Sequence, residues 1–469
     1  MLPHILPISS LMLGTALLLL GNGLMSTLLT LRGSIEGFGD QILGLMGSAY
    51  FVGFLIGTWV VPAMIRRIGH IRAFAFYASS IAVVVLVHAL IVHPVIWLLL
   101  RLATGIALVG FYTVIESWLN SRAVPERRGQ VFAFYMFVNM SALALAQQLL
   151  HLAPPQEFTL FAISAVLICL SVLPLCSTRQ PQPEIQPLPR LTIGKLWAAA
   201  PSSVAASIVS GLSIGTLWSM GPLYAARLGM DAGGVAMLMT ATIAGGAILQ
   251  LPLGRYSDRG DRRHVLAFVA FGATAGALAM AMFGASISAL LISAFVFGGM
   301  SFAIYPIAVA HLIDRLPHEQ ILSGNSGMLL LHGLGAVFGP TAAGALMAVS
   351  GAAGLPVFFA LTIAPLAIFV ALRARGRVDR IVEEAAQFVP MMRTAPTGME
   401  MAAAVEEHRL ESGGHIDHGT PGDEGHAPSG PVTDTDLLPE DEPPATRGAV
   451  RHDGDDALPE EHHEDPPKR

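Results

Sequence analysis

The stretch Gly254-Arg-Tyr-Ser-Asp-Arg-Gly-Asp-Arg-Arg263 matches an earlier one, Pro62-Ala-Met-Ile-Arg-Arg-Ile-Gly-His-Ile71, at an offset of 192 residues. Both stretches are rich in arginine, and both separate long apolar runs. The turn prolines Pro125 and Pro317 recur at the same offset. A repeat of this length in an apolar chain predicts two related bundles of membrane helices.

The composition favours a membrane location for most of the chain. Of the 469 residues, 53% are apolar and 13% are charged. From residue 401 onward, 18 acidic residues stand against 5 basic ones, a net charge of −13; because the whole chain carries −6, residues 1–400 carry +7. The body is therefore basic and the tail acidic. The uncharged run from Met1 to Leu31 is long enough to cross about 30 Å of hydrocarbon, which favours a first membrane helix over a signal peptide.

Twelve apolar stretches of spanning length are separated by short polar connections. The predicted spans are 8–31, 41–65, 73–92, 95–118, 130–152, 158–176, 195–222, 234–254, 265–285, 287–312, 322–347 and 354–372. Each must be helical, because hydrocarbon offers no partner for an unpaired backbone group. The sequence predicts an all-α polytopic membrane protein with twelve transmembrane helices in two pseudo-symmetric six-helix bundles.

The domain organisation follows from these spans. The predicted domains are an N-terminal bundle (1–176), a linker (177–194), a C-terminal bundle (195–375) and a tail (376–469). The linker is rich in Pro and Gln, which makes it a semi-rigid spacer. Arg380–Val389 is a candidate for one or two amphipathic turns on the membrane surface. Beyond about Thr394 the tail is too polar to bury a core, so we expect it to be disordered.

Basic residues fall on one side of the predicted bundles. The even-numbered connections carry fourteen Lys and Arg residues, whereas the odd-numbered connections carry only Arg32 and Arg227. Cytoplasmic connections are enriched in basic residues. We therefore expect the even-numbered connections and both termini to be cytoplasmic.

The repeated connection, the six-plus-six layout and the element Arg101-Leu-Ala-Thr-Gly105 resemble the major facilitator superfamily over residues 1–375. The stretches Ile115-Glu-Ser-Trp-Leu-Asn120 and Gly254–Arg263 resemble its YcaD-like branch. The resemblance implies a secondary active transporter of the bacterial inner membrane that moves a small solute by alternating access. A monomer suffices, because one chain holds both halves. We expect the partners to be a small-molecule substrate, protons and the bilayer, with no cofactor, no metal and no nucleic acid.

In that superfamily the connection reads Gly-x3-Asp-Arg-x-Gly-Arg-Arg, and its acid and arginines hold neighbouring helix ends together. The resemblance gives a gating role to Arg66, Arg67, Gly69, Gly254, Asp258, Arg259, Arg262 and Arg263. The C-terminal copy fits the pattern, with Asp258 as the acid. In the N-terminal copy Pro62 replaces the first glycine and Arg66 replaces the acid. The alternative for that copy is a set of arginines that only obeys the cytoplasmic charge bias.

Two charged residues fall inside the predicted fourth span. An arginine at membrane depth costs about 2.5–3.5 kcal/mol on insertion scales, so Arg101 should face a partner or a cavity unless it snorkels outward. The resemblance implies a role for Arg101 in proton coupling or anion binding. Glu116 suits a carboxyl that loads and unloads protons, with an ion pair to nearby arginines as the alternative. At about 1.5 Å per residue the two lie about 22 Å apart along the helix, so they cannot pair directly.

Several other polar side chains lie within predicted spans of the helices that line the cavity in this superfamily. The predicted substrate cavity consists of Asn22, Tyr112, Asn139, Gln147, Trp218, Tyr305 and His332. Each of these is individually also compatible with a packing role. Together they favour small neutral, weakly charged or amphiphilic substrates.

The sequence holds no Gly-x4-Gly-Lys-Ser/Thr motif, which argues against transport driven by ATP. It also holds no nucleophile or metal-ligand pattern, so we expect no enzyme activity. The alternative function is that of a transporter-like membrane sensor or scaffold that acts through its acidic cytoplasmic tail.

Overall fold

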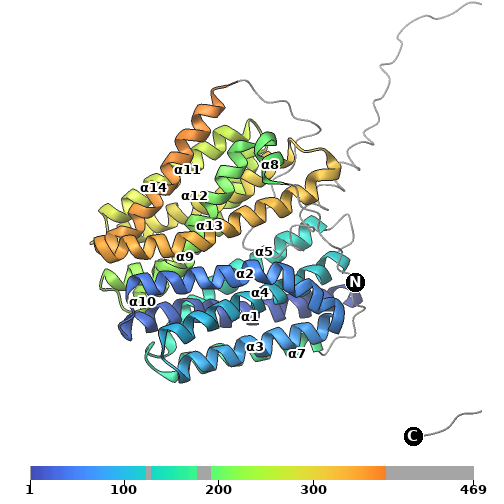
Figure 1. Ribbon diagram of the computed structural model, residues 1–469, viewed down its shortest axis with the longest axis vertical. Coiled ribbons are helices and arrows are strands. Elements are labelled where there is room, and N and C mark those ends of the chain that lie inside the picture. Colours follow the sequence, from blue (N-terminus) through green and yellow to red (C-terminus); the bar gives the residue numbers. More distant parts are fainter. Residues whose placement is uncertain (1, 123–127, 177–191, 377–469) are drawn as a thin grey trace, which may run out of the picture. The chain divides into compact units, whose positions relative to one another are not determined.

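The structure is a computed structural model that describes residues 2–122, 128–176 and 192–376 (Figure 1). The regular elements of these residues are all helices, which confirms the predicted all-α fold. Residues 177–191 of the predicted linker lie outside the described residues. The predicted amphipathic turns and the predicted disorder of the tail, which concern residues beyond 376, lie outside them too.

The first half of the chain is a set of helices that pack on one another. They are α1 (Leu2–Ile35), α2 (Asp40–Ile68), α3 (His70–Leu90), α4 (Pro94–Arg122), α5 (Arg128–Gln148), α6 (Phe158–Leu170) and α7 (Val172–Cys176). One 3-10 turn, η2 (Leu149–Leu152), extends α5. Helix α2 packs against α4, α1 packs against α5 and α6, and α3 packs against α4 and α6. Figure 1 shows α1 to α4 as neighbouring ribbons in blue.

The second half repeats this arrangement. Its helices are α8 (Ile193–Ala199), α9 (Pro201–Arg227), α10 (Ala232–Ser257), α11 (Arg262–Met282), α12 (Ile287–Ile313), α13 (Ile321–Ser350) and α14 (Gly354–Ala374). The 3-10 turns η3 (His318–Gln320) and η4 (Gly351–Ala353) flank α13. Helix α9 packs against α13, α10 against α12, and α11 against both α12 and α14. The pair α10–α12 corresponds to α2–α4 in the first half, as expected for a duplicated bundle.

The membrane spans agree with the sequence prediction. By length and hydropathy, 11 stretches of the described residues can cross a membrane, and the last of them, Ile321–Ala374, covers both α13 and α14. The two helices are separated by η4 and its positive-φ residue Gly351. Twelve membrane helices are therefore confirmed.

One predicted span is interrupted, which corrects its expected continuity. The span 195–222 breaks at Ala200, which has φ −149° and ψ 79°, because the ring of Pro201 disfavours helical geometry in the residue before it. The span 158–176 is confirmed as one spanning helix, Phe158–Cys176, in which a single turn residue, Ser171, separates α6 from α7. Pro174 has no N–H to donate to the carbonyl of Leu170, which accounts for this local irregularity.

The predicted arginine-rich loop at 66–72 is also corrected. Arg66 and Arg67 lie in the last turn of α2, and α3 begins at His70. Gly69 alone joins the two helices, with φ 83°, a conformation that glycine adopts without steric cost. The reversal therefore needs one residue, and the arginines are held on helix ends.

The helix ends form two sides, which we name by one residue each. The Arg227 side comprises the ends joined by odd-numbered connections, and the Arg262 side comprises those joined by even-numbered connections. The halves contact each other chiefly through α2 with α13, α5 with α10, and α1 with α9. A Cβ placed on Gly44 of α2 would collide with the carbonyl of Pro340 on α13. These two helices therefore touch backbone to backbone near the Arg227 side.

Candidate functional site

Glu116 is fully buried on α4 and is bonded to a tyrosine that the sequence prediction missed. The hydroxyl of Tyr135, on α5, donates to Glu116 Oε1 at 3.0 Å. Both side chains have no measurable exposure. A carboxyl that is buried among membrane helices is costly to ionise, so its charge state affects the stability of the helices around it.

Two predicted cavity residues lie one helical turn from this bond. Tyr112 precedes Glu116 by four residues on α4, and Asn139 follows Tyr135 by four on α5, so each shares a helix face with its neighbour. Tyr112 and Asn139 are both buried. We call these four residues, Tyr112, Glu116, Tyr135 and Asn139, the Glu116 cluster.

Arg101 lies towards the other end of α4 and faces the inside of the first half. Its guanidinium carbon is 4.6 Å from the centre of the Tyr50 ring, which α2 supplies. Only 6% of the residue is exposed, which argues against an arginine that snorkels outward. A cation over a desolvated ring gains about 2 kcal/mol. As the helix geometry predicts, Arg101 does not reach Glu116, and its coupling role stays a prediction.

The remaining predicted cavity residues fall into separate groups. Gln147 on α5 accepts a hydrogen bond from Thr27 of α1 at 2.7 Å, so it joins two helices of the first half. Asn22 is buried on α1. In the second half the rings of Tyr305 and His332 lie 4.7 Å apart between α12 and α13, and Trp218 is buried on α9. Their role as a substrate cavity stays a prediction.

The C-terminal gating copy is built around Arg262. Its Nη1 donates to Asp258 Oδ1 at 2.9 Å, and its Nε donates to Asp314 Oδ2 at 2.8 Å. Only 3% of the Arg262 side chain and 6% of the Asp314 side chain are exposed. One guanidinium therefore ties the end of α10 and the start of α11 to the end of α12. The acid Asp258 was predicted, whereas Asp314 was missed.

Arg263 has a different partner from the one that the motif suggested. Its Nη2 and Nε donate hydrogen bonds to Asp261 at 2.7 Å and 3.0 Å. Asp261 also accepts a hydrogen bond from the Arg263 backbone N–H at 2.9 Å and so caps the start of α11. Burial raises the pKa of Asp261, but the bonds from Arg263 outweigh it and hold the pKa below its ordinary 3.8. Gly254 is buried on α10, and Arg259 is exposed.

The N-terminal copy carries arginines where the C-terminal copy carries its two acids, and a histidine where it carries the central arginine. At the offset of 192 residues, Asp258 corresponds to Arg66, Arg262 to His70, and Asp314 to Arg122. His70 is buried beside Trp118, with ring centres 5.7 Å apart. Arg66 and Arg67 are exposed. The two acids and the central arginine of the C-terminal copy therefore have no equivalent at these positions in the first half.

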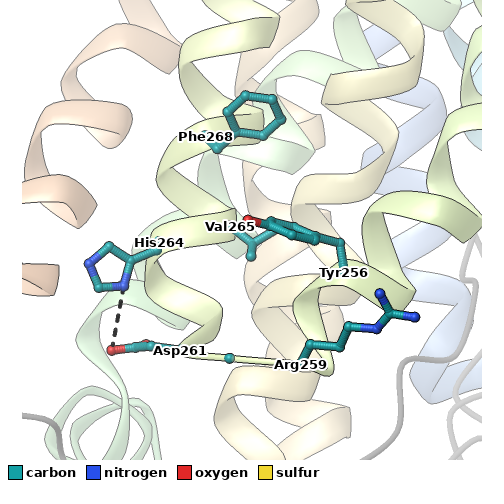
Figure 2. A pocket seen from close by; sticks show the side chains of 7 residues that line it. Tyr256, Arg259, Asp261, His264, Val265 and Phe268 are labelled. Atoms are coloured by element: carbon teal, nitrogen blue, oxygen red, sulfur yellow. Dashed lines mark ion pairs between the residues drawn. The ribbon is translucent and has the colours of Figure 1, made fainter.

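A hollow of about 420 Å³ opens where α10 ends and α11 begins. Figure 2 shows the six labelled residues around it, with Arg259 and the pair Asp261–His264 on opposite sides of the connection. Tyr256, Val265 and Phe268 form its apolar wall. No residue of the predicted substrate cavity lines this hollow.

The comparisons with known proteins agree with this architecture. The model of the Major Facilitator Superfamily matches residues 203–405. An uncharacterized MFS-type transporter of Enterobacter sp. (strain 638) is 28% identical over 73% of this chain and 89% of its own length. The uncharacterized transporter YcaD of Escherichia fergusonii is 27% identical over the same shares. Residues 203–405 are therefore similar to the major facilitator superfamily, and about three quarters of the chain is similar to uncharacterized MFS-type transporters. This likeness agrees with the resemblance to membrane transporters found in the sequence.

Solved structures support the fold. The nucleoside transporter NupG has a TM-score of 0.66 at 14% identity, and covers 79% of this chain and 99% of its own. A D-xylose–proton symporter has a TM-score of 0.62 at 14% identity, with 78% and 97% covered. At this level of identity the likeness concerns the fold and not the substrate.

Proposed function

We propose that this chain is a member of the major facilitator superfamily and a secondary active transporter that moves a small solute across the bacterial inner membrane by alternating access. The substrate site would lie between the bundles 1–176 and 195–375, joined by the linker 177–194. The residues inside the helices favour a small neutral, weakly charged or amphiphilic solute. The support comes from how the two halves meet.

Polar contacts between the halves gather at the Arg227 side. Arg227 at the end of α9 forms an ion pair with Asp40 at the start of α2. Thr30 donates to the Ser219 carbonyl at 3.0 Å, and Ser48 and Thr341 hydroxyls lie 2.7 Å apart. Gln148 donates to Thr240 at 2.7 Å. A transporter closed at one side of the membrane needs such contacts at that side alone, because they must break when the other side closes.

The charge distribution supports placing the Arg262 side in the cytoplasm. Fourteen basic residues in the even-numbered connections against two in the odd-numbered ones follow the positive-inside rule. The state described by the structure would then be closed towards the outside. A reporter fused after Arg375 tests this: green fluorescent protein should fluoresce there, and alkaline phosphatase should be inactive. An active phosphatase would reverse the orientation.

Proton coupling through the Glu116 cluster is the finer part of the proposal. Glu116 is the acid whose burial in the first half is complete, and Tyr135 is positioned to donate to it in its charged form. Arg101 would contribute as a fixed positive charge elsewhere on α4. A carboxyl that binds and releases a proton as the two halves change conformation would couple the movement of protons to the movement of the solute.

The experiment compares Glu116→Gln with Tyr135→Phe in proteoliposomes that carry a pH gradient. A panel of sugars, amino acids, carboxylates and amphiphilic compounds is first screened for substrate-dependent current at two pH values. Glu116→Gln should abolish uphill accumulation of the substrate found and spare its exchange. Tyr135→Phe keeps the carboxyl but removes its hydrogen-bond donor, so it should shift the pH dependence of uphill accumulation without abolishing it. Uphill accumulation that is unchanged in Glu116→Gln contradicts proton coupling at this residue.

A further inference from the structure

The hollow between α10 and α11 shares no residue with the predicted substrate cavity. Its wall includes two aromatic side chains with large exposed fractions, Tyr256 at 62% and Phe268 at 55%. Val265 closes the wall between them. Figure 2 shows the Tyr256 ring lying across Val265 with Phe268 above. The hollow therefore offers an apolar surface of the size of a few side chains.

The charge that the hollow leaves available is positive. Asp261 is engaged by Arg263 through two hydrogen bonds. Arg259, by contrast, is exposed and forms no ion pair within the part of the chain that the structure describes. Arg255, one turn earlier on α10, is exposed as well. A ligand that fits here combines a negative charge with apolar side chains or an apolar tail.

The chain that follows α14 starts beside this hollow. Arg263 Nη1 donates to the backbone carbonyl of Arg373 at 3.1 Å. Arg263 also donates a hydrogen bond to Asp261, which lines the hollow. The end of α14 and the edge of the hollow are thus joined by one arginine side chain.

The segment that comes next has the chemistry that the hollow requires. It reads Asp379-Arg-Ile-Val-Glu-Glu-Ala-Ala-Gln-Phe-Val389, with the acidic pair Glu383-Glu384 between apolar residues. From Gly376 to Glu383 an extended chain reaches up to about 25 Å, at roughly 3.6 Å per residue. Because a short connection closes at a small entropic cost, this segment has an advantage over more distant acidic parts of the tail.

We propose that residues 379–389 dock in the hollow between α10 and α11, with the acidic pair beside Arg259 and apolar side chains on Tyr256 and Phe268. The docked segment would attach the start of the tail to the connection that holds Asp258, Arg262 and Asp314. The other occupant with suitable chemistry is a phospholipid, whose phosphate and acyl chain would compete for the same surface.

Disulfide cross-linking tests the proposal without any need for a substrate. The two native cysteines, Cys169 and Cys176, are free and exposed, so the background is Cys169→Ser/Cys176→Ser. His264→Cys, at a side chain that is 68% exposed, is combined with Glu384→Cys in full-length protein in bilayers. Arg72→Cys with Glu384→Cys is the matched control, because Arg72 is an exposed arginine at the equivalent end of the first half.

Docking predicts that the His264→Cys pair cross-links at least about tenfold faster than the Arg72→Cys pair, since proximity raises effective concentration. Adding Arg259→Glu should remove most of this advantage, and Glu383→Arg in that protein should restore it. Removing residues 394–469 should leave the advantage intact. Equal rates for the two pairs overturn the proposal. A fast rate in detergent that disappears in bilayers also overturns it and assigns the hollow to a phospholipid.

Discussion

At the scale of the single residue, Arg262 holds the connection between α10 and α11 in place. It is buried, and it bonds to acids at the ends of two other helices, Asp258 on α10 and Asp314 on α12. A buried ion of this kind depends on its partners, because removing one member leaves the others charged and desolvated. Arg259, three residues earlier, is exposed and has no such role in the fold.

Replacing these two arginines should therefore have unequal effects on stability. Arg262→Ala should lower the free energy of unfolding by roughly 3 kcal/mol, because it leaves Asp314 buried without its partner. Arg259→Ala should change it by less than about 0.5 kcal/mol. Thermal unfolding of the two purified variants in detergent measures the difference. Equal midpoints would show that the Arg262 network carries no stability.

Asp261 should make part of the stability dependent on pH. Its pKa in the folded protein lies below the ordinary 3.8 because the bonds from Arg263 outweigh burial. Its contribution is therefore complete above about pH 4 and is lost as pH falls through the lower folded pKa. Asp261→Asn should unfold at a lower temperature than the native chain at pH 6, and the gap should narrow as the pH is lowered below 3.8. A gap that does not change with pH contradicts this assignment.

The sequence identifies some of these residues and misses others for a physical reason. Asp258 and Arg262 are found because the repeated motif places them on one connection. Asp314 lies 52 residues from Arg262, and its equivalent in the first half is Arg122, so neither the motif nor the repeat reveals it. Tyr135 has only one signal, its position one turn before Asn139 on the same helix face.

At the scale of the element, helices α2 and α13 form the closest contact between the halves. Gly44 on α2 meets the backbone of Pro340 and Thr341, and Gly344 on α13 meets the carbonyl of Asp40. Small residues at such crossings let membrane helices approach to backbone contact. The hydropathy pattern predicts both helices but not this contact, because hydropathy is silent on which helices are neighbours. The interruption at Pro201, by contrast, was predictable from that proline.

Gly44→Ala should open the Arg227 side. The added Cβ meets backbone atoms that cannot move aside, and overpacking of this kind costs about 1–3 kcal/mol. That cost shifts the balance between the two states by roughly 5- to 150-fold. Alkylation of a Ser48→Cys side chain should then accelerate. Gly39→Ala is the control, because a Cβ there meets nothing within 4 Å. Equal alkylation in both variants would show that the crossing does not hold this side closed.

At the scale of the whole molecule, the duplicated bundles differ most at their gating connections. The second half has the Asp258–Arg262–Asp314 network, in which Arg262 and Asp314 are buried, while the first half has Arg66, His70 and Arg122 at the equivalent positions. At these positions the Arg262 side therefore carries acids in the second half only. On the opposite side the halves are joined by Asp40 and Arg227 and by the hydroxyl pair Ser48 and Thr341. Alternating access requires that these contacts between the halves break and re-form.

The distance between α2 and α9 at the Arg227 side tests that requirement most directly. Spin labels are attached through Asp40→Cys and Arg227→Cys in the Cys169→Ser/Cys176→Ser background, and the distance distribution is measured in bilayers with the compound panel at two pH values. Our account predicts two populations, a short distance that matches the joined halves and a longer one, whose ratio changes with at least one compound. A single short distance under every condition would contradict alternating access in this protein.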